Sequence, residues 1–297
     1  MALPHREDNK AANKRRARRK PPLTLRWLRL SLRLQAMLST SWAVSRLYRL
    51  WFVSPKYTEP KRETHWREQA EQFSIPHEYG PLAAYRWGHG ERVVLLIHGW
   101  SGRGPQMGAF AEPLVNAGYS VIAFDAPSHG RTPGSSTNLF RISDALQTVI
   151  QHCGPVDSII SHSFGTIVLA YTLRHRDLHI NRAVCIGSPA SARLLADRFT
   201  GIMQASAKTR QCFMQQFERE FGHDIWNRIS AEENARGLTI PALIMHDQND
   251  HDVPWQSSQQ LAQAWPNAKL VLSKGLGHRR ILRNPTLVKQ VVDFITH

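Results

Sequence analysis

A chain of 297 residues with 42% apolar side chains is long enough for one large α/β domain, or for one domain with an appendage. Its three cysteines, Cys153, Cys185 and Cys212, lack C-x-x-C spacing, so the sequence predicts no disulfide framework and no zinc site, and it favours a reducing, cytoplasmic compartment. The fifteen histidines contain no H-E-x-x-H pattern, which disfavours a metal hydrolase, and we expect neither a metal nor another cofactor.

The net charge of +15 is concentrated at the N-terminal end of the chain. Residues 1–62 hold 16 Lys and Arg and 3 Asp and Glu, a net charge of +13, and the rest of the chain is almost neutral at +2. A basic segment of this kind favours contact with an anionic surface, either a membrane or a nucleic acid. It carries no information about the substrate of the folded body.

The N-terminal segment is expected to have two parts. Residues 1–22 include the basic run Lys14–Pro22 and should be a disordered tail, because like charges repel and nothing there can build a core. Residues 23–56 should form a basic amphipathic helical arm, with a break near Ser39–Ser41. Arginines interrupt its Leu-rich stretch, so no apolar run reaches the ~20 residues that span a bilayer, and the segment is too charged for a secretory signal.

Two interpretations of the arm remain open. Arg26, Arg29 and Arg33 fall on one helical face, as in helices that lie on an anionic membrane. In that interpretation residues 14–53 make peripheral contact with the inner membrane surface, and nucleic acid is not the expected partner. In the other interpretation the helix packs its apolar side on the body. The oligomeric state is not predicted.

Beyond the arm, the polar segment Lys56–Glu78 is expected to be a linker with a short helix. Two buried strands are then predicted, at Val93–Ile97 and Ser120–Phe124. Further strands are predicted at Leu82–Trp87, Ser158–Ser161, Ala183–Gly187, Leu243–His246 and Leu270–Leu272. Helices are predicted at Pro105–Ala117, Asn138–His152, Phe164–Arg174, Trp255–Ala264 and Pro285–Ile295. This alternation predicts an α/β domain over residues 57–297, with a mostly parallel central sheet and helices on both faces.

The most informative stretch is Ile159–Ala170, in which an apolar run leads into Ser161-His162-Ser163-Phe164-Gly165 and a helical pattern follows at once. Such a strand–turn–helix context lifts a serine off the sheet at a helix N-terminus, where negative charge is favoured. The motif resembles the G-x-S-x-G nucleophile elbow of the α/β-hydrolase superfamily, with Ser161 in place of the first Gly. The resemblance implies that Ser163 is the nucleophile; an ordinary turn with an incidental serine is the alternative.

Two later segments resemble the remaining parts of the family's catalytic triad, in the chain order Ser, Asp, His. The segment Asp247–Pro254 resembles the family's G-x-x-D-x-x-x-P, which implies that Asp250 is the acid. Asp252 and then Asp247 are the alternative candidates for the acid. The segment could also be only a turn rich in Asx residues, without a catalytic role. The segment Gly275-Leu276-Gly277-His278 resembles the catalytic histidine loop, which implies that His278 is the general base.

Two further segments resemble family motifs that follow buried strands. His98-Gly99-Trp100 resembles the HG-x motif, which implies an oxyanion hole built from the backbone N–H groups of Trp100 and Phe164, with His98 structural. Asp125–Thr132 resembles the structural turn D-x-P-G-H-G-x-S, again with Ser for Gly. Together with the elbow and the two triad segments, these matches span roughly Val93–Ile295, most of the body.

Helical patterns without a convincing strand fill Ser188–Thr239. In the superfamily a helical cap domain is inserted at this position, so the resemblance implies a cap at about 188–239. Its larger apolar side chains either line an acyl pocket or pack the cap together. They are Met203, Phe213, Met214, Phe217, Phe221 and Trp226.

The resemblance as a whole implies a serine esterase-like hydrolase that cleaves an ester or thioester of a small acyl substrate. Ser163 would attack the acyl carbonyl, His278 would act as base and then acid, Asp250 would orient His278, and water would cleave the acyl-enzyme. The alternative is a catalytically idle member of the fold, a binding protein that its basic arm recruits to a membrane or a nucleic acid. Fold alone does not choose between substrates.

Overall fold

The computed structural model describes residues 21–297. Almost all of the basic tail expected at 1–22, including the run Lys14–Lys20, lies outside the described residues. The described chain divides into two compact units. We call residues 52–195 with 221–297 the sheet unit, and residues 21–51 with 196–220 the helical unit.

The sheet unit contains one eight-stranded sheet in the order β1-β2-β4-β3-β5-β6-β7-β8. Its strands are β1 Glu71–Ile75, β2 Leu82–Trp87, β3 Arg92–Ile97, β4 Tyr119–Phe124, β5 Val156–His162, β6 Arg182–Ile186, β7 Ala242–Asp247 and β8 Ala268–Ser273. Strand β2 is antiparallel to both of its neighbours, and the pairs from β4 to β8 are parallel. The predicted fold class, α/β with a mostly parallel sheet, is confirmed.

Strand β1 was not predicted, because Glu71–Ile75 falls in the segment expected to be a linker with a short helix. It forms the antiparallel edge of the sheet, paired only with β2. Four of its five side chains are exposed or half-buried, and Ile75 alone is buried. An edge strand that contributes one side chain to the core has no apolar run, so hydrophobic periodicity does not reveal it.

Helices of the sheet unit follow most of the parallel strands. They are α4 Lys61–Glu68, η1 Gly104–Phe110, α5 Ala111–Asn116, α6 Leu139–Cys153, α7 Phe164–His175, α10 Ile225–Arg228, α11 Ala231–Ala235, α12 Gln256–Ala264, α13 Gly277–Arg280, η2 Ile281–Arg283 and α14 Pro285–Thr296. The single helix predicted at Pro105–Ala117 is therefore divided into η1 and α5. A Cβ at Gly108 would lie 2.5 Å from Cβ of Trp66, so this glycine lets η1 pack closely on α4.

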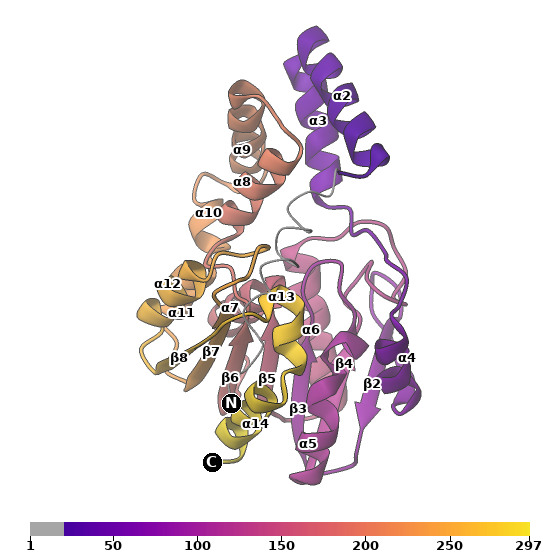
Figure 1. Cartoon of the computed structure of the whole chain (residues 1–297), viewed down its shortest axis with the longest axis vertical. Coiled ribbons are helices and arrows are strands. Elements are labelled where there is room, and N and C mark those ends of the chain that lie inside the picture. Colours follow the sequence, from indigo (N-terminus) through magenta and orange to yellow (C-terminus); the bar gives the residue numbers. More distant parts are fainter. Residues whose placement is uncertain (1–20) are drawn as a thin grey trace, which may run out of the picture. The chain divides into compact units, whose positions relative to one another are not determined.

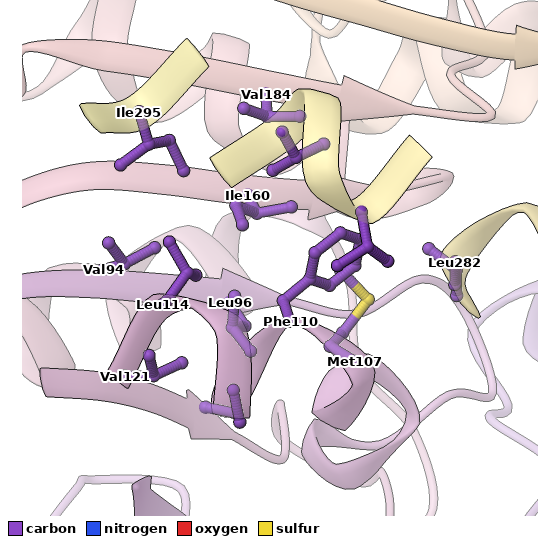
Figure 2. Packing of buried hydrophobic residues seen from close by; sticks show 14 of the residues in the cluster. Val94, Leu96, Met107, Phe110, Leu114, Val121, Ile160, Val184, Leu282 and Ile295 are labelled. Atoms are coloured by element: carbon purple, nitrogen blue, oxygen red, sulfur yellow. The ribbon is translucent and has the colours of Figure 1, made fainter. Parts of the chain in front are cut away.

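One large apolar cluster joins β3, β4, β5 and β6 to η1, α5 and α14. Figure 2 shows Val94 and Leu96 of β3 beside Ile160 and Val184, with Phe110 packed among them. The alternate β3 residues, such as Leu95, are also fully buried, and they face the other side of the sheet, where α7 contacts β3 and β5. Burial on both faces explains why the central strands read as continuous apolar runs.

The helical unit contains α2 Leu23–Leu38, α3 Thr40–Trp51, the end of α8 Ala192–Ile202 and most of α9 Ala207–Phe221 (Figure 1). Helices α2 and α3 meet at the extended residue Ser39, with φ −156° and ψ 117°. The indole of Trp51 packs edge-on against Phe213 and Phe217 of α9, with ring centroids 6.2 and 6.0 Å away. The arm and the cap were expected as separate parts, but this unit combines residues of both; a cap over about 188–239 stays a prediction.

Among residues 21–297, no helix is both long enough and apolar enough to cross a bilayer.

Candidate active site

The topology of the sheet brings the predicted site residues to the carboxyl ends of its parallel strands. Strands β3 and β5 are neighbours, but the chain leaves β3 toward β4 on one side and leaves β5 toward β6 on the other. The carboxyl ends of parallel strands at such a reversal form a crevice in which ligands bind. The loop after β3 carries Trp100 and the turn after β5 carries Ser163, while Asp250 and His278 follow β7 and β8.

Ser163 lies between β5 and α7, and its backbone has φ 53° and ψ −121°. A positive φ is rare for a residue with a Cβ, and such strain is found where a turn holds a side chain in a fixed position. The Ser163 N–H donates to the carbonyl of Ile186, 2.9 Å away, which ties the turn to β6. The hydroxyl therefore sits at the start of α7, in the geometry of an elbow.

Ser161 replaces a glycine of the family motif without strain, because its backbone is not among those with positive φ in the described chain. Its fully buried hydroxyl donates to the carbonyl of Val184, 3.0 Å away, and lies 3.0 Å from Oγ1 of Thr166. Thr166 in turn contacts the hydroxyl of Ser188 at 2.9 Å. This buried network holds the turn to β6 and to α7.

The loop after β3 passes very close to Ser163. A Cβ at Gly99 would lie 2.9 Å from Cβ of Ser163, so only a glycine permits this approach. Trp100 follows, and its ring packs edge-on against Phe164, with centroids 5.3 Å apart. The two residues expected to supply oxyanion-hole N–H groups are thus in contact, and Phe164 directly follows Ser163 in the chain.

His98 ties this loop to the loop after β4. Its Nδ1 contacts the carbonyl of Gly99 at 2.7 Å and its Nε2 accepts the N–H of Ala126 at 3.0 Å, which assigns the proton to Nδ1. Burial lowers the pKa of His98 to about 4, so the ring is neutral at pH 7. In the same loop, Ser128 takes the left-handed conformation, φ 68°, which favours glycine.

The structure brings His278 and Asp250 into contact. Nδ1 of His278 donates to Oδ2 of Asp250 over 2.6 Å, and the Asp250 side chain is almost fully buried. Burial alone would raise the pKa of Asp250, but hydrogen bonds from His246 and His278 outweigh it and hold that pKa well below its usual value. A Cβ at Gly187 would lie 3.2 Å from Nδ1 of His278, so this glycine leaves room for the ring.

The two alternative acids have different surroundings. Asp247 is fully buried and accepts hydrogen bonds from Ser273 and from the backbone N–H groups of Leu276 and Gly277, so it holds the loop that precedes His278. Burial would raise the pKa of Asp247, but these donors lower it overall. Asp252 is exposed, and its N–H donates to Oδ1 of Asp250.

Sequence reasoning missed two buried histidines beside His278 and Asp250. Nε2 of His246 lies 3.1 Å from Oδ2 of Asp250, and its Nδ1 lies 2.6 Å from Oγ of Ser258. Nε2 of His162 donates to the backbone carbonyl of His278 over 3.0 Å, and the two rings are 4.6 Å apart. His246 follows an apolar run, and His162 lies inside the elbow. A polar residue at the end of each of these strands was the only sign in the sequence that they belong to the site.

Asp250, Asp252 and His278 also offer ligand atoms within 4.8 Å of one another, the kind of set that can hold a metal ion. However, Nδ1 of His278 already donates a hydrogen bond to Asp250. This hydrogen bond has the short length of a charge-assisted one. The arrangement can instead keep one imidazole nitrogen protonated and leave the other available as a base. A serine needs such a base to become a nucleophile.

Comparisons with known proteins bear on the same segments. A family model described as the alpha/beta hydrolase family matches residues 94–291. The lysophosphatidylserine lipase ABHD12 of Danio rerio is 26% identical over 258 residues, which are 79% of this chain and 62% of the fish protein. This chain thus spans less than two thirds of that relative's length.

Two further proteins are similar over most of their own length. A non-heme haloperoxidase of Rhodococcus erythropolis is 25% identical over 239 residues, 65% of this chain and 87% of the bacterial protein. The structure of mouse alpha/beta hydrolase domain-containing protein 10 aligns with a TM-score of 0.59 at 18% identity, over 76% of this chain and 97% of the mouse chain. That likeness shows the fold, and the curated relatives are named as enzymes. With the family model matching two thirds of its length, the chain belongs to the alpha/beta hydrolase family of enzymes.

Proposed function

We propose that this protein is a serine hydrolase that cleaves an ester or thioester through an acyl-enzyme. Ser163 attacks the acyl carbonyl while His278 takes the hydroxyl proton and passes it to the leaving group. Water then attacks the acyl-enzyme with His278 again as base, which releases the carboxylic acid and restores Ser163. Asp250 orients the imidazole and stabilises its protonated form, and the N–H groups of Trp100 and Phe164 bind the oxyanion.

The observation that carries this proposal is the contact between His278 and Asp250, 2.6 Å long. Ser163 has a positive φ, and the ring of its chain neighbour His162 lies 4.6 Å from that of His278. With its Nδ1 proton directed at a carboxylate, His278 keeps Nε2 for proton transfer. The pKa of Asp250 lies well below its usual value, so the carboxylate is ionised throughout the neutral range. An acyl substrate agrees with the name of the relative from Danio rerio, a lysophosphatidylserine lipase.

A direct experiment is hydrolysis of p-nitrophenyl esters of graded acyl length by the full chain. The proposal predicts saturable release of p-nitrophenol with a preference for one range of lengths, which would also identify the substrate class. The alternative, an idle member of the fold that acts by binding, predicts release no faster than with denatured protein.

We also propose that the helical unit makes peripheral contact with an anionic membrane. Seven of the twelve exposed large apolar side chains in residues 21–297 belong to α2 and the start of α3. They are Leu23, Trp27, Leu30, Leu34, Met37, Leu38 and Trp42. No acidic residue occurs in 23–51, which holds five arginines. A basic helix with an exposed Trp- and Leu-rich surface is typical of segments that lie in the headgroup layer.

The membrane proposal predicts that the full chain sediments with anionic vesicles, that it does so weakly with neutral ones, and that salt weakens the binding, because exposed charges are screened over ~8 Å at physiological ionic strength. Replacing Leu34 and Leu38 by Gln should reduce sedimentation severalfold, whereas Leu272→Gln, an exposed leucine of β8, should leave it unchanged. Equal sedimentation of both variants, or none by the unaltered chain, would contradict the proposal.

A further inference from the structure

The helical unit contains a groove of about 480 Å³ that the proposed chemistry does not use. Its apolar lining consists mainly of Leu32 and Ala36 of α2, Ala43 and Leu47 of α3, and Met203 and Ala205 before α9. Ligand-binding pockets in proteins are typically ~300–1,000 Å³ and mostly apolar. A water molecule occupies about 30 Å³ of the liquid, and a methylene group is of similar size, so the groove has room for a chain of roughly ten or more carbons.

Three arginines of α2 and α3 have no carboxylate partner among residues 21–297, and one of them, Arg33, lines this groove. Arg33 lines the groove and donates to Oε1 of Gln204 over 3.0 Å, and Arg29 donates to the carbonyl of Ile202 over 2.7 Å. Arg46 of α3 donates to Ser31 and Gln35. All three guanidinium groups thus have neutral hydrogen-bond partners, and no lining residue of the groove is acidic.

The end of α8 fixes the backbone of Gln204 beside this groove. Gln204 has φ 54°, its N–H donates to the carbonyl of Gly201 over 3.0 Å, and the N–H of Ala205 donates to that of Thr200 over 3.0 Å. These two hydrogen bonds and the positive φ are the usual left-handed C-cap of an α-helix. At this cap the amide oxygen of Gln204 accepts the hydrogen bond from Arg33.

We propose that this groove binds one molecule of a single-chain anionic amphiphile, such as a fatty acid, with its hydrocarbon chain among the apolar side chains and its anionic group on Arg33. The positive charge of Arg33 favours an anionic occupant. The chain's own residues 1–20 hold eight basic and two acidic residues, so their net charge has the same sign as that of Arg33. A cationic amphiphile would meet the same repulsion.

The test is calorimetric titration of the full chain with octanoate, decanoate and dodecanoate below their micelle concentrations. Binding should saturate at one site in the helical unit and tighten by up to about fourfold per added methylene until the groove is filled. Dodecyltrimethylammonium, with the same chain and opposite charge, should not bind. The full chain carrying Ser163→Ala should bind dodecanoate equally, so this result does not depend on whether the protein hydrolyses esters.

Matched variants locate the site. Arg33→Gln should weaken dodecanoate binding at least fivefold, whereas Arg49→Gln removes the same charge from an exposed position of α3 outside the groove and should not. Ala36→Phe should fill the groove and abolish binding, while Ala207→Phe, exposed at the start of α9, should leave it intact.

Three outcomes would overturn the proposal: no saturable binding by the unaltered chain, equal affinities of the Arg33 and Arg49 variants, or binding to vesicles without binding of the monomeric amphiphile. Unfolding curves of each variant identify any loss that comes from misfolding. Arg33→Gln removes an exposed side chain and tests the site even where Ala36→Phe does not fold.

Discussion

Replacing Ser163 by Ala should lower kcat for a p-nitrophenyl ester by about 10⁴- to 10⁶-fold, because the attacking oxygen is removed and only binding and oxyanion stabilisation remain. The fold should survive, since the substitution leaves the backbone at φ 53° with a residue that has the same Cβ. Steady-state kinetics together with circular dichroism measure both effects.

A matched control is Ser128→Ala, the same chemical change at another serine with positive φ. The Ser128 hydroxyl donates to the carbonyl of Ser136 over 2.8 Å, so its loss should lower the free energy of unfolding by about 1 kcal/mol. Its kcat should stay within a few-fold of the unaltered protein. If Ser163→Ala retains activity like that of Ser128→Ala, Ser163 is not the nucleophile.

Asp250→Asn should lower kcat by about 10⁴-fold, because an amide in place of Oδ2 no longer fixes the Nδ1 proton of His278 or stabilises the protonated ring. Asp252→Asn should cost less than tenfold, since its exposed side chain is not the group that His278 Nδ1 contacts. The comparison separates the two acids that the sequence left open. A large loss in the Asp252 variant with a small one in the Asp250 variant would transfer the role.

The pH dependence follows from the same contact. The pKa of Asp250 lies well below its usual value, so this carboxylate stays ionised as the pH falls through 5. A folded-state pKa that is lowered in this way stabilises the fold above the ordinary carboxyl pKa and loses that contribution only as the pH falls further, through the lowered pKa. Protonation of Asp250 should therefore contribute nothing to a loss of kcat above pH 5, which a kcat profile over pH measures.

The parallel core of the sheet could be predicted from sequence because burial on both faces leaves a continuous apolar run. Leu95 and Leu96 are both fully buried, although they face opposite sides of the sheet. Strand β1 could not be predicted, since only one of its five side chains is buried and its place in the sheet depends on backbone pairing with β2. The sequence of five residues does not indicate which strand will pair with them.

The site was predictable to the extent that motifs mark positions along the chain. Ser163, Asp250 and His278 follow β5, β7 and β8 at places where such residues were expected, but their roles stay predictions. The supporting contacts were not predictable. That Asp247 accepts hydrogen bonds from the loop before His278, and that His246 contacts Asp250 and Ser258, depends on how β7, β8 and α12 pack together.

The helical unit was the least predictable part. Residues 21–51 and 196–220 are far apart in the chain, and they join through contacts such as that of Tyr48 with Phe217, whose ring centroids lie 4.8 Å apart. An amphipathic helix requires an apolar partner, but the spacing of its apolar residues does not indicate which segment that partner is. The arm therefore has both buried and exposed apolar side chains: Leu47 of α3 is buried, whereas Trp27 of α2 is 68% exposed.

The central claim is that Ser163 is an activated nucleophile, and the most direct measurement is labelling of the full chain with a fluorophosphonate followed by mass spectrometry of its peptides. A reactive serine displaces fluoride and forms a stable phosphonate ester, whereas an ordinary serine does not react. We predict one modification per chain at Ser163, lost in Ser163→Ala and strongly slowed in Asp250→Asn. An unlabelled chain, or labelling at another residue that persists in Ser163→Ala, would contradict the account.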